Sequence, residues 1–224
     1  YDAALLQQLE ALPDGVIAAS ERIAPLQPDH LAYLIYTSGS TGVPKGTALA
    51  HQNLLHYLLW ARKTYSCYEG SGAPINTSIA FDATITSLWL PLISGSCVSL
   101  FSGADDIEEL AKQLNQQSGF SLVKLTPIHM DVLCNSLDPE SLSEQTRSYI
   151  VGGEQLNAKT IQLLRDHAPS TRIINEYGPT ETVVGCCVYE VNDTTPTEGS
   201  IPIGSPIWNT QLYILDPTLT PVPD

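Results

Sequence analysis

The chain has 224 residues, of which 43% are hydrophobic and 15% charged, so it is long enough to bury a substantial core. Its formal net charge of −14 argues against a nucleic-acid or anionic-membrane partner, because the summed field of the protein would repel both. The sequence has no apolar run of eighteen residues and no basic segment followed by an apolar one at its start, so it predicts neither a membrane span nor secretion.

Residues 33–46 predict an apolar strand that runs into a phosphate-binding loop. Glycines allow the backbone to turn its N–H groups inward, hydroxyl groups add donors, and a lysine adds positive charge. These features predict a polyphosphate ligand. The candidate ligand residues in the loop are Thr37, Ser38, Gly39, Ser40, Thr41, Gly42 and Lys45.

Two other interpretations of this loop are weaker. A Walker A loop requires Ser or Thr directly after its lysine, whereas Lys45 is followed by Gly46 and preceded by Pro44, which predicts that the lysine lies in a turn. A flexible linker of glycine and serine would not ordinarily be entered through an apolar strand and left toward an apolar stretch such as 54–60.

The segments that follow the loop predict alternating helices and short strands. Leucines at helical spacing predict a helix over 52–65, and a short strand is expected at 78–81. Asp105 is a suitable N-cap for a helix over 107–115, and Gly119 is its expected stop.

The middle of the chain predicts a β-α-β-α-β series, and therefore an α/β fold with a mostly parallel sheet and flanking helices. The expected strands are 120–125, 149–151 and 172–174, and the expected helices are 127–134 and 157–167. Ligands of such sheets bind beyond the carboxyl ends of the strands, where residues 152–154 and 175–181 fall. From Thr182 onward, β-branched residues and prolines predict the start of a β-rich layer.

The five cysteines lack the spacing of a disulfide framework, which favours reduced thiols and a cytoplasmic location. Cys186 and Cys187 would face opposite sides of a strand, so we expect them to be packing residues. The five histidines are too scattered to predict a metal site, and most are expected at the surface or at helix ends.

Residues 175–181 read Asn-Glu-Tyr-Gly-Pro-Thr-Glu and could bind most of a nucleotide. They offer an aromatic face for a base, an amide, a hydroxyl for phosphate and a carboxylate for a metal. Taken alone, the same residues could be a polar β-turn with an incidental tyrosine.

Together, residues 33–46 and 175–181 resemble two signature motifs of the adenylate-forming (AMP-binding) superfamily, and more narrowly of the adenylation domains of nonribosomal peptide synthetases. Residues 81–84 stand at the place of the Phe-Asp motif of that family, and residues 201–207 and 212–223 resemble its next stretch. The resemblance covers nearly the whole chain, but only the interior of a family member.

The resemblance implies that residues 1–224 are part of the large, flavodoxin-like N-terminal subdomain, without its first part and without the C-terminal subdomain. Within it, 28–100 would hold the phosphate loop and amino-acid anchor, 101–190 the nucleotide site and specificity pocket, and 191–224 the start of the β-rich region.

The resemblance also implies roles for individual residues toward ATP and Mg²⁺. The loop 37–46 would embrace the β and γ phosphates, and Tyr177 would stack on adenine. Thr180 would touch the α phosphate and Glu181 would bind magnesium, which makes these two the candidate catalytic residues. The remaining candidates beside the nucleotide are Gly153, Asn175 and Gly178.

Asp82 would pair with the α-amino group of an amino acid, a role that distinguishes this family from acyl- or aryl-CoA ligases. Its competing interpretation is a helix N-cap before residues 85–90. By the same resemblance, the substrate side chain would be lined by Asp82, Ala83, Thr86, Lys124, Ile150, Gly152, Glu176, Val184 and Gly185.

Lys124 and Glu176 are the charged exceptions in an otherwise small and apolar set. A carboxamide between them would satisfy both, since its oxygen accepts from the lysine and its amino group donates to the glutamate. Asparagine is the expected substrate, and the family's pocket signature for asparagine is similar. Glutamine is second, and an ion pair near the surface without a substrate role is the competing interpretation.

The predicted function is therefore ATP-dependent activation of an amino acid as aminoacyl-AMP. The resemblance implies transfer to phosphopantetheine on a peptidyl carrier domain, with the C-terminal subdomain of the same synthetase as a second partner. This segment alone would have little turnover. The alternatives are acyl- or aryl-CoA ligase-type adenylation and a non-catalytic excised specificity subdomain.

Overall fold

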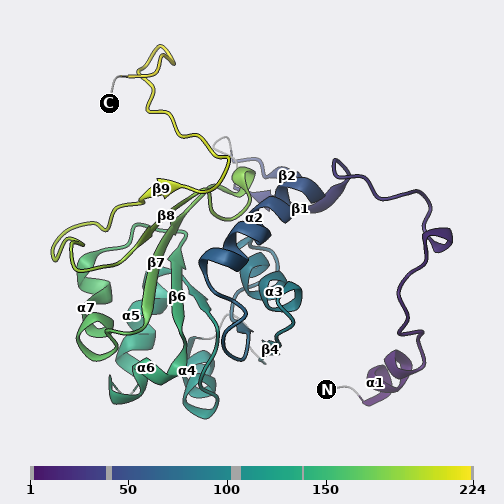
Figure 1. Cartoon of the computed structure of the whole chain (residues 1–224), viewed down its shortest axis with the longest axis horizontal. Helices are drawn as coiled ribbons and strands as arrows, with labels where there is room; N and C mark the ends of the chain where they lie inside the picture. Colours follow the sequence, from purple (N-terminus) through teal and green to yellow (C-terminus); the bar gives the residue numbers. More distant parts are fainter. Residues whose placement is uncertain (1–2, 39–41, 102–106, 138, 223–224) are drawn as a thin grey trace.

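The computed structural model describes residues 3–38, 42–101, 107–137 and 139–222, and the fold is α/β as the sequence predicts (Figure 1). Its centre is one five-stranded sheet in the order β5-β6-β7-β8-β9. The first three strands are parallel and the last two are antiparallel. The strands are β5 (Val123–Leu125), β6 (Ser148–Gly152), β7 (Arg172–Tyr177), β8 (Cys187–Glu190) and β9 (Ser205–Pro206).

The predicted β-α-β-α-β series is confirmed. Helix α5 (Pro127–Ser136) follows β5, and α7 (Ala158–His167) joins β6 to β7. Thr126 caps α5 by accepting from the His129 N–H at 3.3 Å, and Pro127 opens the helix where no N–H partner is needed. The β-rich segment expected after residue 182 joins this same sheet as β8 and β9.

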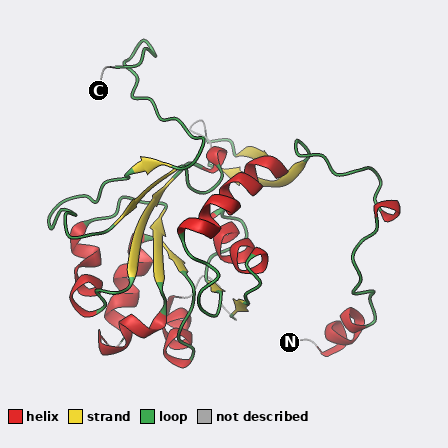
Figure 2. Cartoon of the chain, in the orientation of Figure 1, coloured by secondary structure: helices red, strands yellow, loops and turns green. Residues whose placement is uncertain are grey.

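Helices cover both faces of the sheet, because alternate strand residues point to opposite sides (Figure 2). On one face, Tyr149, Val151 and Ile173 pack against apolar residues of α4 (Ile107–Gln116), α5 and α7. On the other face, Ile150 and Ile174 pack against α2 (His51–Thr64) and α3 (Ala83–Ile93). Strands with both faces buried fit a parallel sheet.

The N-terminal half contributes two small sheets. Strands β1 (Leu31–Thr37) and β2 (Lys45–Ala50) form an antiparallel hairpin, and β3 (Ala73–Ile75) pairs in parallel with β4 (Val98–Leu100). The remaining elements are α1 (Ala3–Glu10), η1 (Ala19–Glu21), η2 (Pro139–Ser141), α6 (Leu142–Gln145) and η3 (Thr180–Thr182).

Three local expectations are wrong. Lys45 is not in a turn but opens β2, so a strand separates the loop from α2. The Lys, Gly and Ala residues of β2 have weak β-propensity, and the segment is extended through pairing with β1. Residues 78–81 form a turn rather than a strand. Strand β5 is shorter than 120–125, since Phe120 makes only an isolated bridge to Thr146. The expected N-cap Asp105 lies outside the described residues.

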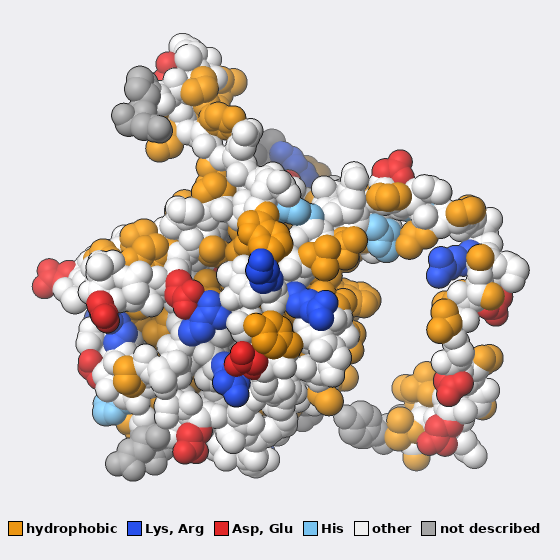
Figure 3. Space-filling view, viewed as in Figure 1, with side chains coloured by type: hydrophobic (Ala, Val, Ile, Leu, Met, Phe, Trp, Pro, Cys, Tyr) orange, Lys and Arg blue, Asp and Glu red, His pale blue; other side chains and the backbone are white. Residues whose placement is uncertain are grey.

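The segment before β1 runs away from the body of the protein, and α1 has no buried residue (Figure 1). Apolar side chains are exposed along it, whereas acidic and basic side chains are interspersed over the body (Figure 3).

All five cysteines are free, and Cys186 and Cys187 are buried as expected of packing residues. Among the helices of the described ranges, none is both long and apolar enough to cross a bilayer.

Candidate functional site

Two adjoining cavities lie at the carboxyl ends of β5, β6 and β7. The inner cavity, of about 400 Å³, is lined by residues that include Asp82, Ala83, Lys124, Gly152, Glu176 and Val184. The outer cavity, of about 420 Å³, is lined by residues that include Asn175, Tyr177, Pro179, Ile201 and Ile203. Gly153, Glu154, Glu176 and Gly178 line both, so the cavities share a wall.

The polar centre of the inner cavity is an ion pair between Lys124 and Glu176. Each residue is only 3% exposed, and the Lys124 ammonium contacts Oε2 of Glu176. The competing interpretation placed this pair near the surface, and that location is wrong. The two charges also contact each other directly, whereas a carboxamide was expected between them.

Two residues of α2 and its C-cap complete this centre, and the sequence did not predict them. Tyr57 donates to Oε1 of Glu176 at 2.9 Å and Tyr65 donates to the same oxygen at 2.5 Å. Burial raises the pKa of both phenols, so both keep the proton that they donate. Burial lowers the pKa of Lys124 to about 7, against the opposing effect of the Asp82 carboxylate.

Asp82 occupies the N-cap position of α3, but its side chain accepts no bond from the first turn of that helix. Its Oδ2 atom is buried and has no hydrogen-bond partner among the described residues. A buried carboxylate oxygen without a hydrogen bond destabilises the protein unless a ligand donates to it, and a cationic donor gives the strongest such bond. The geometry therefore favours the anchor interpretation over the cap.

The other predicted pocket residues divide into two groups. Ala83, Gly152 and Val184 line the inner cavity. Gly185 backs it, since a Cβ there would lie 2.4 Å from Cγ of Glu176. Two more residues lie behind the wall, so that they and Gly185 do not line the cavity: Thr86, whose hydroxyl is 2.7 Å from that of Tyr57, and Ile150, which belongs to the apolar core.

The outer cavity presents an aromatic face beside a fixed amide. Tyr177 is 47% exposed, which leaves its ring open to a planar ligand. Asn175 is buried, and its Nδ2 donates to the Pro202 carbonyl at 2.8 Å, so this amide group also holds the loop that closes the cavity. Both of its side-chain hydrogen bonds within the described ranges are donated by Nδ2, and an amide oxygen such as Oδ1 can accept from a ligand.

The hairpin lies against η3, which carries Thr180 and Glu181. Thr37 and Lys45 face each other at its loop end, where the Thr37 hydroxyl donates to the Lys45 carbonyl at 3.4 Å. Gly42 has a φ of 79°, and Ser38 is exposed, whereas the candidates Gly39, Ser40 and Thr41 lie outside the described residues. None of the described hairpin residues lines either cavity.

Glu181 is exposed and could take part in binding a magnesium ion. No cluster of three His, Cys, Asp or Glu side chains suited to a metal occurs in the part of the chain that the structure describes. A single carboxylate fits magnesium, which usually keeps several waters and binds substrate phosphates beside one or two carboxylates.

Sequence reasoning missed His129 as a cavity residue. This residue lies in the first turn of α5 and lines the inner cavity, and its buried Nδ1 has no partner among the described residues. The expectation of a surface or helix-end histidine overlooked one signal, which was its place directly after a strand whose carboxyl end carries the site.

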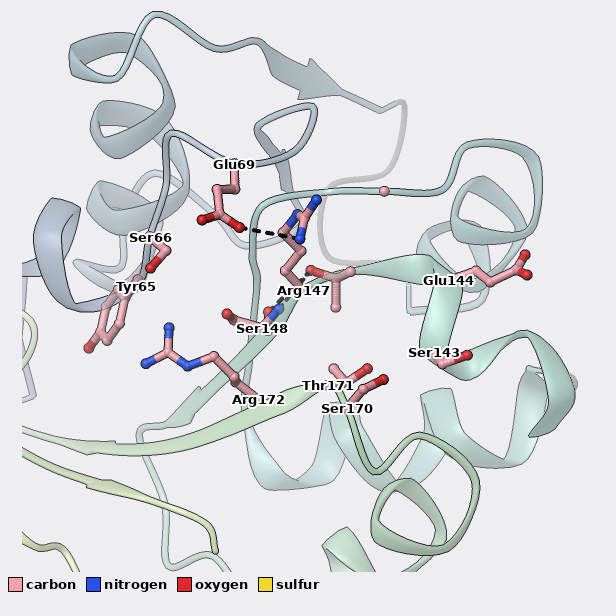
Figure 4. Close-up of a pocket in the computed structure, with 12 residues that line it drawn as sticks. Tyr65, Ser66, Glu69, Ser143, Glu144, Arg147, Ser148, Ser170, Thr171 and Arg172 are labelled. Atoms are coloured by element: carbon pink, nitrogen blue, oxygen red, sulfur yellow. Dashed lines mark hydrogen bonds and ion pairs between the residues drawn. The ribbon is translucent and has the colours of Figure 1, made fainter.

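A third cavity, of about 450 Å³, lies at the amino ends of β6 and β7 (Figure 4). It shares no lining residue with the inner or outer cavity. Both of its arginines are already paired: Arg147 contacts Glu69 at 3.3 Å, and Arg172 binds Glu190 through two bonds of 2.7 and 2.8 Å. Tyr65 lines this cavity while its hydroxyl reaches Glu176.

Comparisons with known proteins identify the family of this chain. The AMP-binding enzyme family matches residues 2–224. The chain is 44% identical to tyrocidine synthase 3 of Brevibacillus parabrevis over 198 residues, which are 88% of this chain and 3% of that protein. It is 41% identical to bacitracin synthase 3 of Bacillus licheniformis over 189 residues, or 84% of this chain and 3% of that protein.

Solved structures of similar fold include a nonribosomal peptide synthetase protein that contains adenylation and PCP domains, with a TM-score of 0.76 and 26% identity over 96% of this chain and 37% of that one. The AMPPNP-bound form of the nonribosomal peptide synthetase FmoA3 gives a TM-score of 0.74 and 27% identity over 87% of this chain and 21% of that one. The chain thus spans a small part of the relatives that it matches. With a match over nearly its whole length, the chain belongs to the AMP-binding enzyme family.

Proposed function

We propose that this chain binds ATP and an amino acid in the adjoining cavities and serves the ATP-dependent formation of an aminoacyl adenylate. The observation that carries the proposal is the inner cavity. It holds the Asp82 oxygen that has no partner among the described residues and the buried Lys124–Glu176 pair, and it adjoins the outer cavity, which Tyr177 lines with its exposed ring. The similarity to peptide synthetases, one of them bound to AMPPNP, supports it.

In this reaction the substrate carboxylate attacks the α phosphorus, a new P–O bond forms, and the bond to pyrophosphate breaks. The protein contributes mainly position and charge. Asp82 would hold the ammonium group, Tyr177 the base and Thr180 the α phosphate, while the hairpin loop with Lys45 would hold the outer phosphates. A magnesium ion held by Glu181 would offset charge on the phosphate oxygens.

Asparagine is the side chain that we propose for the inner cavity. Its carboxamide supplies an acceptor for Lys124 and a donor for Glu176, and it would bind beside their direct contact. Aspartate would place an acceptor against Glu176, and leucine would leave both charges without a ligand. Each polar group left without a partner would weaken binding by about 1 to 3 kcal/mol. Glutamine differs by one methylene, which a pocket discriminates by only ~1 to 3 kcal/mol.

We further propose that the adenylate passes to phosphopantetheine on a carrier domain, in a cytoplasmic synthetase that also supplies the C-terminal subdomain. A solved relative that contains adenylation and PCP domains supports this partner. The thiol would attack the acyl carbon, the acyl–phosphate bond would break, and AMP would leave.

Calorimetric titration of the chain with asparagine, glutamine, aspartate and leucine, each in the presence of ATP and magnesium, tests the proposal. We expect asparagine to bind tightest and glutamine next. The full synthetase should exchange labelled pyrophosphate into ATP only with the amino acid that binds. Exchange driven by a carboxylic acid without an amine would instead indicate an acyl- or aryl-CoA ligase, and a preference for leucine or aspartate would contradict the asparagine assignment.

Replacing Tyr177 with alanine should weaken ATP binding by about tenfold, because stacking of a base on an aromatic ring contributes about 1 to 3 kcal/mol. The Kd for ATP can be measured by calorimetry. Tyr68→Ala is a suitable control, since Tyr68 is also exposed but lines neither the inner nor the outer cavity. Equal losses in the two variants would argue against a base at Tyr177.

A further inference from the structure

The carboxylate of Glu176 is held by more donors than an ion pair alone provides. Oε1 accepts from both Tyr57 and Tyr65, and Oε2 accepts from Lys124. The side chain of Glu176 is fully buried, and the two tyrosines are at most 1% exposed. Three donors, two from α2 and its C-cap and one from β5, therefore fix one carboxylate in the wall of the inner cavity.

The two tyrosines are themselves held rigidly. Tyr57 lies within α2 and Tyr65 is its C-cap residue, so one helix delivers both hydroxyls. The ring of Trp60 packs between them, with ring centroids 6.0 Å from Tyr57 and 5.3 Å from Tyr65. Gly185 lies so close to Glu176 that a Cβ there would be 2.6 Å from Oε1, which closes the remaining side.

This arrangement leaves Glu176 with one oxygen that can serve a ligand. A carboxylate has about four lone-pair sites, two on each oxygen. The two phenols use both sites of Oε1, whereas Lys124 uses one site of Oε2. In its ammonium form Lys124 has three protons and donates one of them to Glu176 within the described chain, so two protons remain beside the free site of Oε2.

The free acceptor site on Oε2 of Glu176 lies beside the spare donors of Lys124. This pair matches a ligand group that carries a donor and an acceptor on neighbouring atoms, such as a carboxamide. We propose that Tyr57 and Tyr65 are positioning residues that make the inner cavity selective for a carboxamide over a carboxylate, by saturating Oε1 and presenting ionised Oε2 beside Lys124. This inference rests on the proposed function and deepens it. A ligand carboxylate would place one of its two oxygens, which only accept, against Oε2. The Glu176 carboxylate cannot rotate to avoid this contact while both phenols bind Oε1.

Without the phenols, Oε1 is free, and the carboxylate can rotate or take a proton and then donate to a ligand carboxylate. The test is the ratio of aspartate Kd to asparagine Kd, measured by calorimetry with ATP in the Tyr57→Phe, Tyr65→Phe and doubly substituted chains. We expect each single variant to lower this ratio by several-fold and the double variant by at least about tenfold.

Tyr149→Phe is the matched control, since Tyr149 is equally buried but its hydroxyl has no partner among the described residues. It should leave the ratio unchanged. The Glu176→Gln background is a second control: if the phenols act through Glu176, the double Tyr→Phe change should alter the ratio there by less than about twofold.

The outcomes separate the inference from the function on which it rests. A wild-type chain that prefers asparagine, with the same ratio in the double Tyr→Phe variant, overturns the inference alone. A lower melting temperature without a change in ratio has the same meaning, because it shows a purely structural role. A wild-type chain that binds ATP but none of the four amino acids overturns the proposed function.

Discussion

Replacing Asp82 with asparagine is expected to weaken amino-acid binding by about 100-fold while leaving the free energy of unfolding nearly unchanged. The physical reason is that Oδ2 of Asp82 is buried without a partner among the described residues, so a substrate ammonium supplies the bond that the protein does not make. Asp82 does not cap α3 through its side chain, and the fold therefore loses little when the charge is removed.

Calorimetry with the best amino acid measures the first effect, and denaturant unfolding measures the second. The Kd for ATP should stay within about twofold, because Asp82 does not line the outer cavity. Asp131→Asn removes an exposed carboxylate from α5 and should change none of these quantities. A large loss of stability in Asp82→Asn, with amino-acid binding retained, would restore the N-cap interpretation.

Replacing Lys124 with methionine is expected to lower the free energy of unfolding by about 3 to 5 kcal/mol and to abolish selective binding of asparagine. The substitution leaves the charge of Glu176 buried, with two neutral phenols as its remaining donors. An uncompensated charge in the interior costs far more than the loss of an exposed pair.

The double variant Lys124→Met/Glu176→Gln separates the two effects. It should recover part of the lost stability, because no lone charge remains, but it should not recover selectivity for asparagine over leucine. Lys112→Met breaks the exposed contact with Glu109 and should cost less than about 1 kcal/mol, which makes it the matched control. Full stability in Lys124→Met would show that the ion pair does not hold the centre of the inner cavity.

Local patterns in the sequence were sufficient to predict the parallel core of this protein. Strands β5, β6 and β7 and helices α5 and α7 follow from short apolar runs, helical spacing and caps, all of which act over a few residues. Because parallel strands end at a common edge, the sequence also indicated that Gly152, Glu176 and Tyr177 lie together. The motifs at 33–46 and 175–181 were enough to predict the family.

The construction of the polar centre, by contrast, was only partly predictable. The family resemblance brought Lys124 and Glu176 together across 52 residues, whereas Tyr57 is 119 residues from Glu176 and no local pattern showed that these two side chains meet. Strand β2 likewise exists through its pairing with β1. Local chemistry fixes where helices and parallel strands begin, whereas the partners of a buried charge are set by which helix packs on which face of the sheet.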